Sequence, residues 1–198
     1  MSFDALHLLA LRRKADLASL VQAGGIDGAV LEAALAPAIA DGRVIQARGL
    51  YVLAPAGAAW LQSQYPQVFA ATRADSVLAA EYQRFELINR ELKTLITQWQ
   101  TLEVGGKPVL NDHSNADHDA RILDRLAALH ERAEAQIACM AARLPRLGRY
   151  ALRLSEALDR AEAGELDWVS SIRCDSYHTV WFEMHEDLLR LLDKRREE

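Results

Sequence analysis

The sequence of 198 residues has few of the features that mark a disulfide-stapled, all-β or membrane-spanning protein. Its two cysteines, Cys139 and Cys174, form no CxxC motif, which argues against a disulfide framework and a cysteine zinc site and favours a reducing cytoplasm. Glycine occurs 10 times and proline 5 times, too rarely to punctuate a sandwich of short strands. No uncharged apolar run reaches about 18 residues, so we expect no membrane-spanning segment.

An excess of either sign of charge is also absent from the N-terminal third of the sequence. The whole sequence has 23 basic and 28 acidic residues, a formal net charge of -5, but residues 1–60 contain five of each. The acidic excess therefore belongs to the rest of the chain, and the total charge says nothing against nucleic acid as a partner of the first part. Asp4 interrupts the first apolar stretch and the basic residues follow it, which argues against a secretory leader and for a cytoplasmic protein.

Three short helices and a hairpin are predicted over the first 60 residues. Asp16 and Asp27 are placed to cap the second and third helices. Ala47-Arg48-Gly49 is a three-residue hairpin connection with glycine last. Pro37 lies inside the third helix, where we expect a kink. The predicted elements are a helix ending at residues 12–14, a second ending at Gly24-Gly25, a third over 27–41, strands at 43–46 and 50–53, and a helix beginning at Pro55.

This order of elements is that of a winged helix-turn-helix. The stretches Asp41-Gly42-Arg43-Val44 and Gly49-Leu50-Tyr51-Val52-Leu53-Ala54-Pro55-Ala56-Gly57 resemble the end of the recognition helix, the wing and the Leu-Thr-Pro-Ala-Gly segment of MarR-like regulators, with Ala54 in place of threonine. The resemblance covers residues 1–60 and implies a domain that binds double-stranded DNA. Phosphate contacts would then fall on the basic residues of this part, which are Arg12, Arg13, Lys14, Arg43 and Arg48.

The third predicted helix is nevertheless poorly equipped to recognise bases. Residues 27–41 contain no Lys, Arg, Asn, Gln, Ser or Thr, and their polar side chains are three carboxylates, which phosphate repels. An alternative stays open, in which the winged helix packs against protein and the chain serves as an accessory subunit or interaction module.

The remainder of the chain predicts an all-α bundle, joined to the first part around residues 60–72. Its first helix has a heptad seam, which suits a coiled coil or bundle. A loop over 103–115 follows, then helices over 116–144, from Leu147 to a cap at Gly164, and from near Leu166 to the end. We therefore expect a mainly α protein with a winged helix domain at 1–65 and an all-α dimerisation and effector domain at 73–198. The seam residues are Leu78, Tyr82, Phe85, Asn89, Leu92, Ile96 and Trp99.

Several strings in residues 76–198 resemble a helical domain of actinobacterial transcription regulators. The resemblance implies a dimerisation or effector role and names no ligand. The strings are Tyr82-Gln83-Arg84-Phe85 with Asn89 and Trp99-Gln100, Asn111-Asp112-His113, Arg149-Tyr150, Asp175-Ser176-Tyr177-His178-Thr179-Val180-Trp181-Phe182-Glu183, and His185-Glu186-Asp187-Leu188.

Polar residues on the predicted helices are the candidates for ligand binding. Asn89, in the apolar seam, either contacts a ligand or bonds to a neighbouring helix. His178 and His185 share one face with Cys174 and Trp181, but two helical turns, about 10 Å, separate the histidines, too far to share a metal unaided. They either pack in the bundle or a dimer interface, or bind a divalent ion with help from other residues. The candidates for that help are His113, Asp117, His118 and His130.

A divalent ion bound by histidines in a helical bundle behind a winged helix resembles the arrangement in the metal-binding helical domain of GntR-type regulators. Asp175 and His178 are spaced i, i+3 rather than i, i+4, so no ligand carries over by motif. We predict no obligatory cofactor, with a divalent metal as the one candidate.

A further pocket, for a small anionic effector, is predicted where His113 meets a basic helix carrying Arg149 and Arg153. No GxSxG, phosphate loop, HExxH or GxGxxG motif is present, so no enzyme is predicted. The leading hypothesis is a homodimeric transcriptional regulator without membrane partners. The rivals are the interaction module and a small metal-dependent enzyme built on the bundle.

Overall fold

A computed structural model describes residues 2–195 of the chain. The structure is mainly helical, with 73% helix, 10% strand and small antiparallel sheets. The described residues form two compact units, an N-terminal unit of residues 2–74 with 185–195 and a helical unit of residues 75–184. The predicted domains, 1–65 and 73–198, differ from these units chiefly at the end of the chain, whose last helical turns group with the N-terminal unit.

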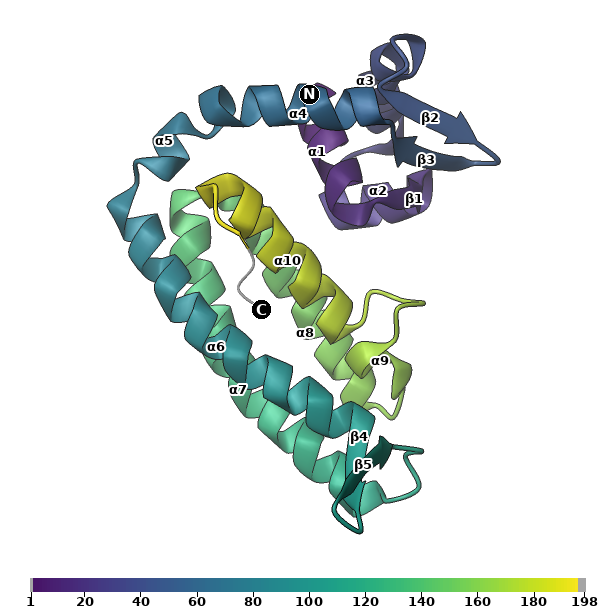
Figure 1. Cartoon of the computed structure of the whole chain (residues 1–198), viewed down its shortest axis with the longest axis vertical. Coiled ribbons are helices and arrows are strands. Elements are labelled where there is room, and N and C mark those ends of the chain that lie inside the picture. Colours follow the sequence, from purple (N-terminus) through teal and green to yellow (C-terminus); the bar gives the residue numbers. More distant parts are fainter. Residues whose placement is uncertain (1, 196–198) are drawn as a thin grey trace. The chain divides into compact units, whose positions relative to one another are not determined.

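The N-terminal unit alternates short helices with a three-stranded antiparallel sheet, in the order β1-β3-β2 (Figure 1). Both predicted helix caps are confirmed: Asp16 accepts a hydrogen bond from the Ser19 amide at 2.8 Å, and Asp27 accepts one from the Ala29 amide at 3.0 Å. The elements are α1 (Ser2–Arg12), β1 (Lys14–Asp16), α2 (Leu17–Gly24), α3 (Gly28–Ala40), β2 (Val44–Ala47), β3 (Leu50–Leu53), α4 (Pro55–Val68) and α5 (Ala70–Arg73).

Two local predictions for this unit are corrected by the structure. Residues 14–16 form a strand, which lies beside β3 and not beside its hairpin partner β2. The hairpin turn has two residues, because Ala47 pairs with Leu50 and both Arg48 (φ 53°) and Gly49 (φ 76°) are left-handed. The predicted third helix forms with Pro37 inside it and extends to Ala40.

The core of the N-terminal unit is built around α1, in which residues 5–11 are all buried. A helix that is apolar all round must be covered on every side, and the sequence supplies that apolarity in Ala-Leu-His-Leu-Leu-Ala-Leu. The first turn of α4 approaches the sheet closely, since a Cβ added at Gly57 would lie 2.2 Å from the Arg43 carbonyl oxygen.

The helical unit is dominated by two long helices, α6 and α7, that lie side by side (Figure 1). The heptad prediction for α6 is confirmed, because all seven seam residues are at least nine-tenths buried. The elements are α6 (Ser76–Gln100), β4 (Thr101–Val104), β5 (Lys107–Leu110), α7 (Ala116–Arg143), a 3-10 turn (Pro145–Leu147), α8 (Gly148–Glu162), α9 (Asp167–Ser170) and α10 (Tyr177–Leu192), which continues into the N-terminal unit.

The all-α prediction for this half is corrected in two places. A β4–β5 hairpin overlaps the expected loop at 103–115, and its Gly105-Gly106 turn has φ of 60° and 75°. The expected last helix, from near Leu166, is interrupted after α9, and α10 begins at Tyr177, where the Ser176 hydroxyl accepts a hydrogen bond from the Thr179 amide at 3.3 Å.

Among the described residues, no single helix is long and apolar enough to cross a membrane. The consecutive helices α2 and α3 reach that length and apolarity only when taken together, and they are bent by 113° at the break between them.

Candidate functional site

Three exposed cations of the N-terminal unit lie on or beside its sheet. Arg13 occupies the left-handed turn (φ 64°) between α1 and β1, Lys14 begins β1, and Arg48 is at the tip of the β2–β3 hairpin. None of the three makes an ion pair with another described residue. The register places Lys14 opposite Val52 and Ala47 opposite Leu50, so two rungs of the sheet, roughly 7 Å, separate Lys14 from the turn.

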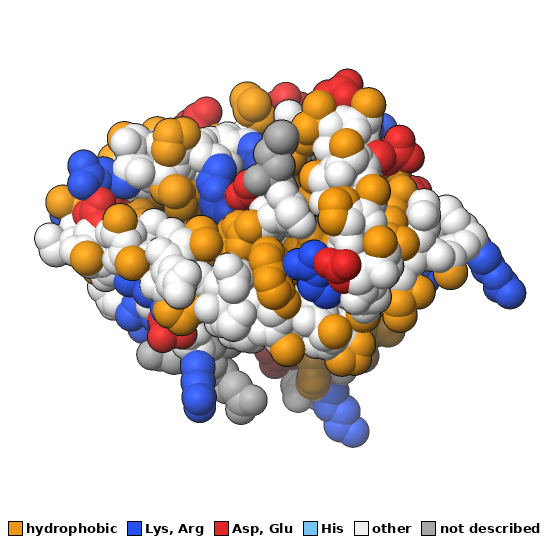
Figure 2. Space-filling view, turned by 90° about the horizontal axis from the view of Figure 1, so that it is seen from above, with side chains coloured by type: hydrophobic (Ala, Val, Ile, Leu, Met, Phe, Trp, Pro, Cys, Tyr) orange, Lys and Arg blue, Asp and Glu red, His pale blue; other side chains and the backbone are white. Residues whose placement is uncertain are grey.

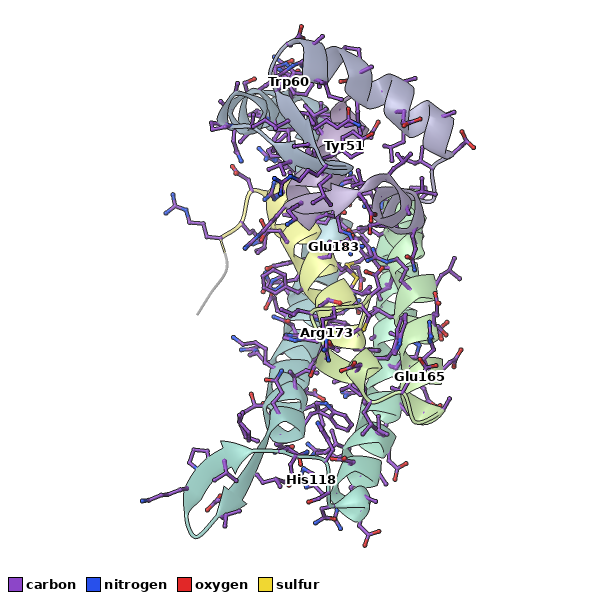
Figure 3. The ribbon with its side chains drawn as sticks, turned by 90° about the vertical axis from the view of Figure 1, so that its right-hand side faces the viewer. Tyr51, Trp60, His118, Glu165, Arg173 and Glu183 are labelled. Atoms are coloured by element: carbon purple, nitrogen blue, oxygen red, sulfur yellow. The ribbon has the colours of Figure 1, made fainter. Side chains whose placement is uncertain are left out.

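The other two predicted phosphate contacts are less accessible. Arg12, in the last turn of α1, is half-buried. The guanidinium of Arg43 pairs with Asp41 at 2.6 Å and lies over the Trp60 ring, 4.8 Å from its centroid. Its side chain is 18% exposed, and Figure 3 labels Trp60 on α4. Arg43 is thus engaged in fastening the end of α3 to α4.

The outward face of α3 carries small apolar side chains. Ala29, Val30, Ala33 and Ala36 are exposed, and Glu32 is the charged side chain among them. Seen from above in Figure 2, basic side chains lie singly or beside acidic ones among hydrophobic and uncharged groups. The exposed surface of α3 presents no hydrogen-bond donor side chain, because residues 28–40 contain none.

The N-terminal unit contains a buried polar cluster that the sequence patterns did not predict. His7 of α1 is 1% exposed and pairs with Asp187 of α10 at 2.8 Å, while its other ring nitrogen lies 3.2 Å from the Tyr65 hydroxyl. Arg190 donates to the same hydroxyl at 3.3 Å. A single histidine inside the leucine run of α1 was the available signal. The cluster ties the end of α10 to α1 and α4.

In the helical unit, Arg153 is the centre of a buried ion cluster. Its guanidinium donates to Asp175 at 2.9 Å and to both oxygens of Glu183 at 2.8 and 2.9 Å. Burial opposes its charge, but the hydrogen bonds and charge of Glu183 and the charge of Asp175 outweigh burial and raise the pKa of Arg153 above its ordinary value. Figure 3 labels Glu183 on α10. The predicted effector residue Arg153 is thus saturated by carboxylates of its own chain.

Asn89 bonds to a neighbouring helix, one of the two alternatives that the sequence left open. Its Oδ1 accepts from the Trp181 indole at 3.0 Å and its Nδ2 donates to Glu86 at 3.1 Å. The Trp181 ring stacks on Phe85 with centroids 5.0 Å apart. The amide therefore serves the seam between α6 and α10.

The two histidines predicted on one face of the last helix fall in different units, His178 in the helical unit and His185 in the N-terminal unit. Burial lowers the pKa of His178 below its ordinary 6.5, and burial likewise lowers that of His130, with nearby carboxylates opposing the shift. Cys174 precedes α10, and burial and then Asp167 raise the pKa of its thiol.

His113 and Asp119 form a second polar cluster at the junction of β5 and α7. His113, at a φ of 58°, places its Nδ1 2.9 Å from Asp119 and its ring 4.6 Å from that of Trp99. Asn111 donates to Asp119 at 3.0 Å. Arg149, expected beside His113, instead lies over the ring of its neighbour Tyr150, 5.0 Å from its centroid.

No group of three or more His, Cys, Asp or Glu side chains suited to holding a metal is found in the part of the chain that the structure describes. Comparison of the chain with protein-family models, with curated proteins and with solved structures gives no match. The residues themselves are therefore the basis for any functional assignment.

Proposed function

We propose that the chain is a DNA-binding transcriptional regulator, a homodimer in which the N-terminal unit is a winged helix and the helical unit serves dimerisation and effector binding. The element order α1-β1-α2-α3-β2-β3 and the strand order β1-β3-β2 support the winged helix, with β2 and β3 as the wing. The resemblance of residues 41–57 to MarR-like regulators supports it independently.

The observation that carries this proposal is the placement of Arg13, Lys14 and Arg48. Exposed cations on one small sheet, without carboxylate partners among the described residues, are suited to neutralising phosphates. An arginine at the tip of a two-residue hairpin turn is also suited to a narrow minor groove, whose negative potential attracts it. Arg43, paired with Asp41, contributes to folding and is no longer one of the proposed contacts.

In this account, α3 enters the major groove without hydrogen-bond donors. Its alanines can contact thymine methyl groups, and Glu32 can accept a hydrogen bond from cytosine. Sequence preference would therefore come from apolar contacts and DNA shape, and most of the affinity from phosphates.

Fluorescence anisotropy with a labelled duplex from the region upstream of the chain's own gene tests the proposal. The triple variant Arg13→Ala, Lys14→Ala, Arg48→Ala should lose binding at low salt, because it removes the three unpaired cations that lie on or beside the sheet in the described residues. Lys93→Ala, an exposed cation on α6, is the matched control and should bind as the parent protein does. Absence of binding by the parent protein itself would refute the proposal.

A second candidate function is a protein-interaction module, favoured by the exposed face of α3. Four of its outward residues are alanine or valine, which allow another helix to approach closely. A protein of this kind would show no salt-dependent affinity for DNA, so the same titration separates the two functions.

A further inference from the structure

A cleft of about 840 Å³ lies between the β4–β5 hairpin and the first three turns of α7, inside the helical unit. Its volume lies in the range of small-molecule sites. Figure 3 labels His118, which lines the cleft, at the end of the unit where the hairpin lies. None of the effector residues predicted from the sequence lines it.

One face of α7 supplies the basic wall of the cleft. His118, Arg121, Ile122 and Arg125 are spaced i, i+3, i+4 and i+7, so they share a stripe of the helix, and all four line the cleft. The two arginines are one turn apart, where like charges repel. The positive end of the α7 dipole, at the cap Asn115, lies at the same cleft.

The partners of these basic side chains inside the chain are neutral or missing. Arg125 donates to the amide oxygen of Gln98 at 2.7 Å, and His118 donates from Nε2 to the Gln98 carbonyl at 3.0 Å. Arg121 is exposed and pairs with no described residue, including Asp117 one turn earlier on α7. Among the described residues that line the cleft, Glu103 alone is acidic. Two guanidinium groups therefore face the cleft without a carboxylate between them.

Apolar side chains of the hairpin line the opposite wall, beside Gln98, Thr101 and Glu103. Leu102, Val104 and Pro108 of the hairpin and Ile122 of α7 line the cleft, and Val104 is 61% exposed. A phosphate or acetate ion would use the arginines and leave this apolar surface wet. A ligand that fits both walls has an acidic head and an apolar body.

From this juxtaposition we propose that the cleft binds a small amphipathic carboxylate. The carboxylate lies between Arg121 and Arg125, whose planar forks suit its two oxygens, and the apolar body lies against Leu102, Val104 and Pro108. As a binding site the cleft is independent of DNA binding. Its role as the effector site rests on the proposed regulatory function.

Isothermal titration calorimetry of the full chain with sodium octanoate, in the absence of DNA, tests the site. Octanoate should bind, whereas 1-octanol and acetate at the same concentrations should not, since each lacks one half of the ligand. Arg121→Ala and Arg125→Ala should each weaken binding by about tenfold or more, the usual effect of losing a hydrogen bond to a charged group. Arg121→Lys should recover part of the affinity, and Arg90→Ala, an exposed arginine on α6, should leave it unchanged.

No heat of binding for octanoate, equal binding of 1-octanol, or undiminished binding by both arginine variants would overturn the proposal. Circular dichroism of each variant confirms that it is folded, and all of the replaced arginines are exposed. Adding octanoate to the DNA titration is a separate measurement. Octanoate binding without any DNA affinity would refute the regulator and leave the site intact.

Discussion

Replacing Arg153 by methionine should destabilise the helical unit severely, because it removes the cation from a buried ion cluster. The Arg153 side chain is 7% exposed, and its partners Glu183 and Asp175 are 5% and 12% exposed. Methionine keeps an apolar stem like that of the arginine but lacks the guanidinium group, so both carboxylates lose its five donors. Because the packing of the stem is kept, most of the loss is electrostatic.

The magnitude follows from burial. Removing one partner of a buried pair costs about 3–5 kcal/mol, since the remaining charge is left desolvated. Replacing Glu183 by methionine as well removes one of those charges, so the double variant Arg153→Met, Glu183→Met should be more stable than Arg153→Met alone by about 1–3 kcal/mol. Arg132→Met is the control, because that arginine and its partner Glu91 are 53% and 51% exposed, so the change in stability should be less than about 1 kcal/mol.

Urea unfolding followed by tryptophan fluorescence measures these differences, and Trp181 lies in the same unit. At a slope of roughly 2 kcal/mol per molar urea, the midpoint for Arg153→Met should fall by about 2 M with the slope unchanged. A fall no larger than that of Arg132→Met would refute the reasoning. So would a double variant whose loss equals the sum of the two single losses.

Two further predictions concern packing and pH. Gly57→Ala should lower the free energy of unfolding by about 3 kcal/mol, because its Cβ would lie 2.2 Å from the Arg43 carbonyl oxygen. Gly28→Ala should be neutral or slightly stabilising, because the atom nearest to its Cβ would be 3.7 Å away. Equal melting temperatures for the two variants would contradict this. Because burial lowers the pKa of His130 and His178 below 6.5, the folded chain binds these protons less readily than the unfolded chain. The stability that these two histidines contribute should therefore be fully present above about pH 6.5 and be lost as the pH drops through their lowered pKa values. The urea midpoint of the double variant His130→Gln, His178→Gln should depend less on pH than that of the parent protein. An equally steep dependence would exclude these two groups as its cause.

The elements that the sequence predicted are those with strong local signals. The heptad seam of α6 and the caps Asp16 and Asp27 follow from residues within a few positions of one another. The strand β1 has only three residues and exists because β3, more than 30 residues later, pairs with it. The β4–β5 hairpin did have a local signal, since Gly105-Gly106 suits a turn in which both residues are left-handed.

The roles of the predicted site residues depend on partners that the sequence did not predict. Arg153 was expected to face an effector, but it pairs with carboxylates 22 and 30 residues further along the chain, a distance at which sequence spacing carries no information. Arg43 pairs with Asp41, a neighbour that was visible, but its contact with Trp60 depends on the close packing of α4. The cleft beside α7 could not be foreseen without the β4–β5 hairpin that forms its other wall.

The dependence of DNA affinity on salt tests the central claim most directly. In the proposed dimer, the exposed sheet cations Arg13, Lys14 and Arg48 of each protomer would make six phosphate contacts, so a plot of log affinity against log salt concentration should have a slope of about -5. The triple alanine variant should bring that slope toward zero, and Lys93→Ala should leave it unchanged. No measurable affinity at low salt, or a slope that the triple variant leaves unchanged, would contradict the account.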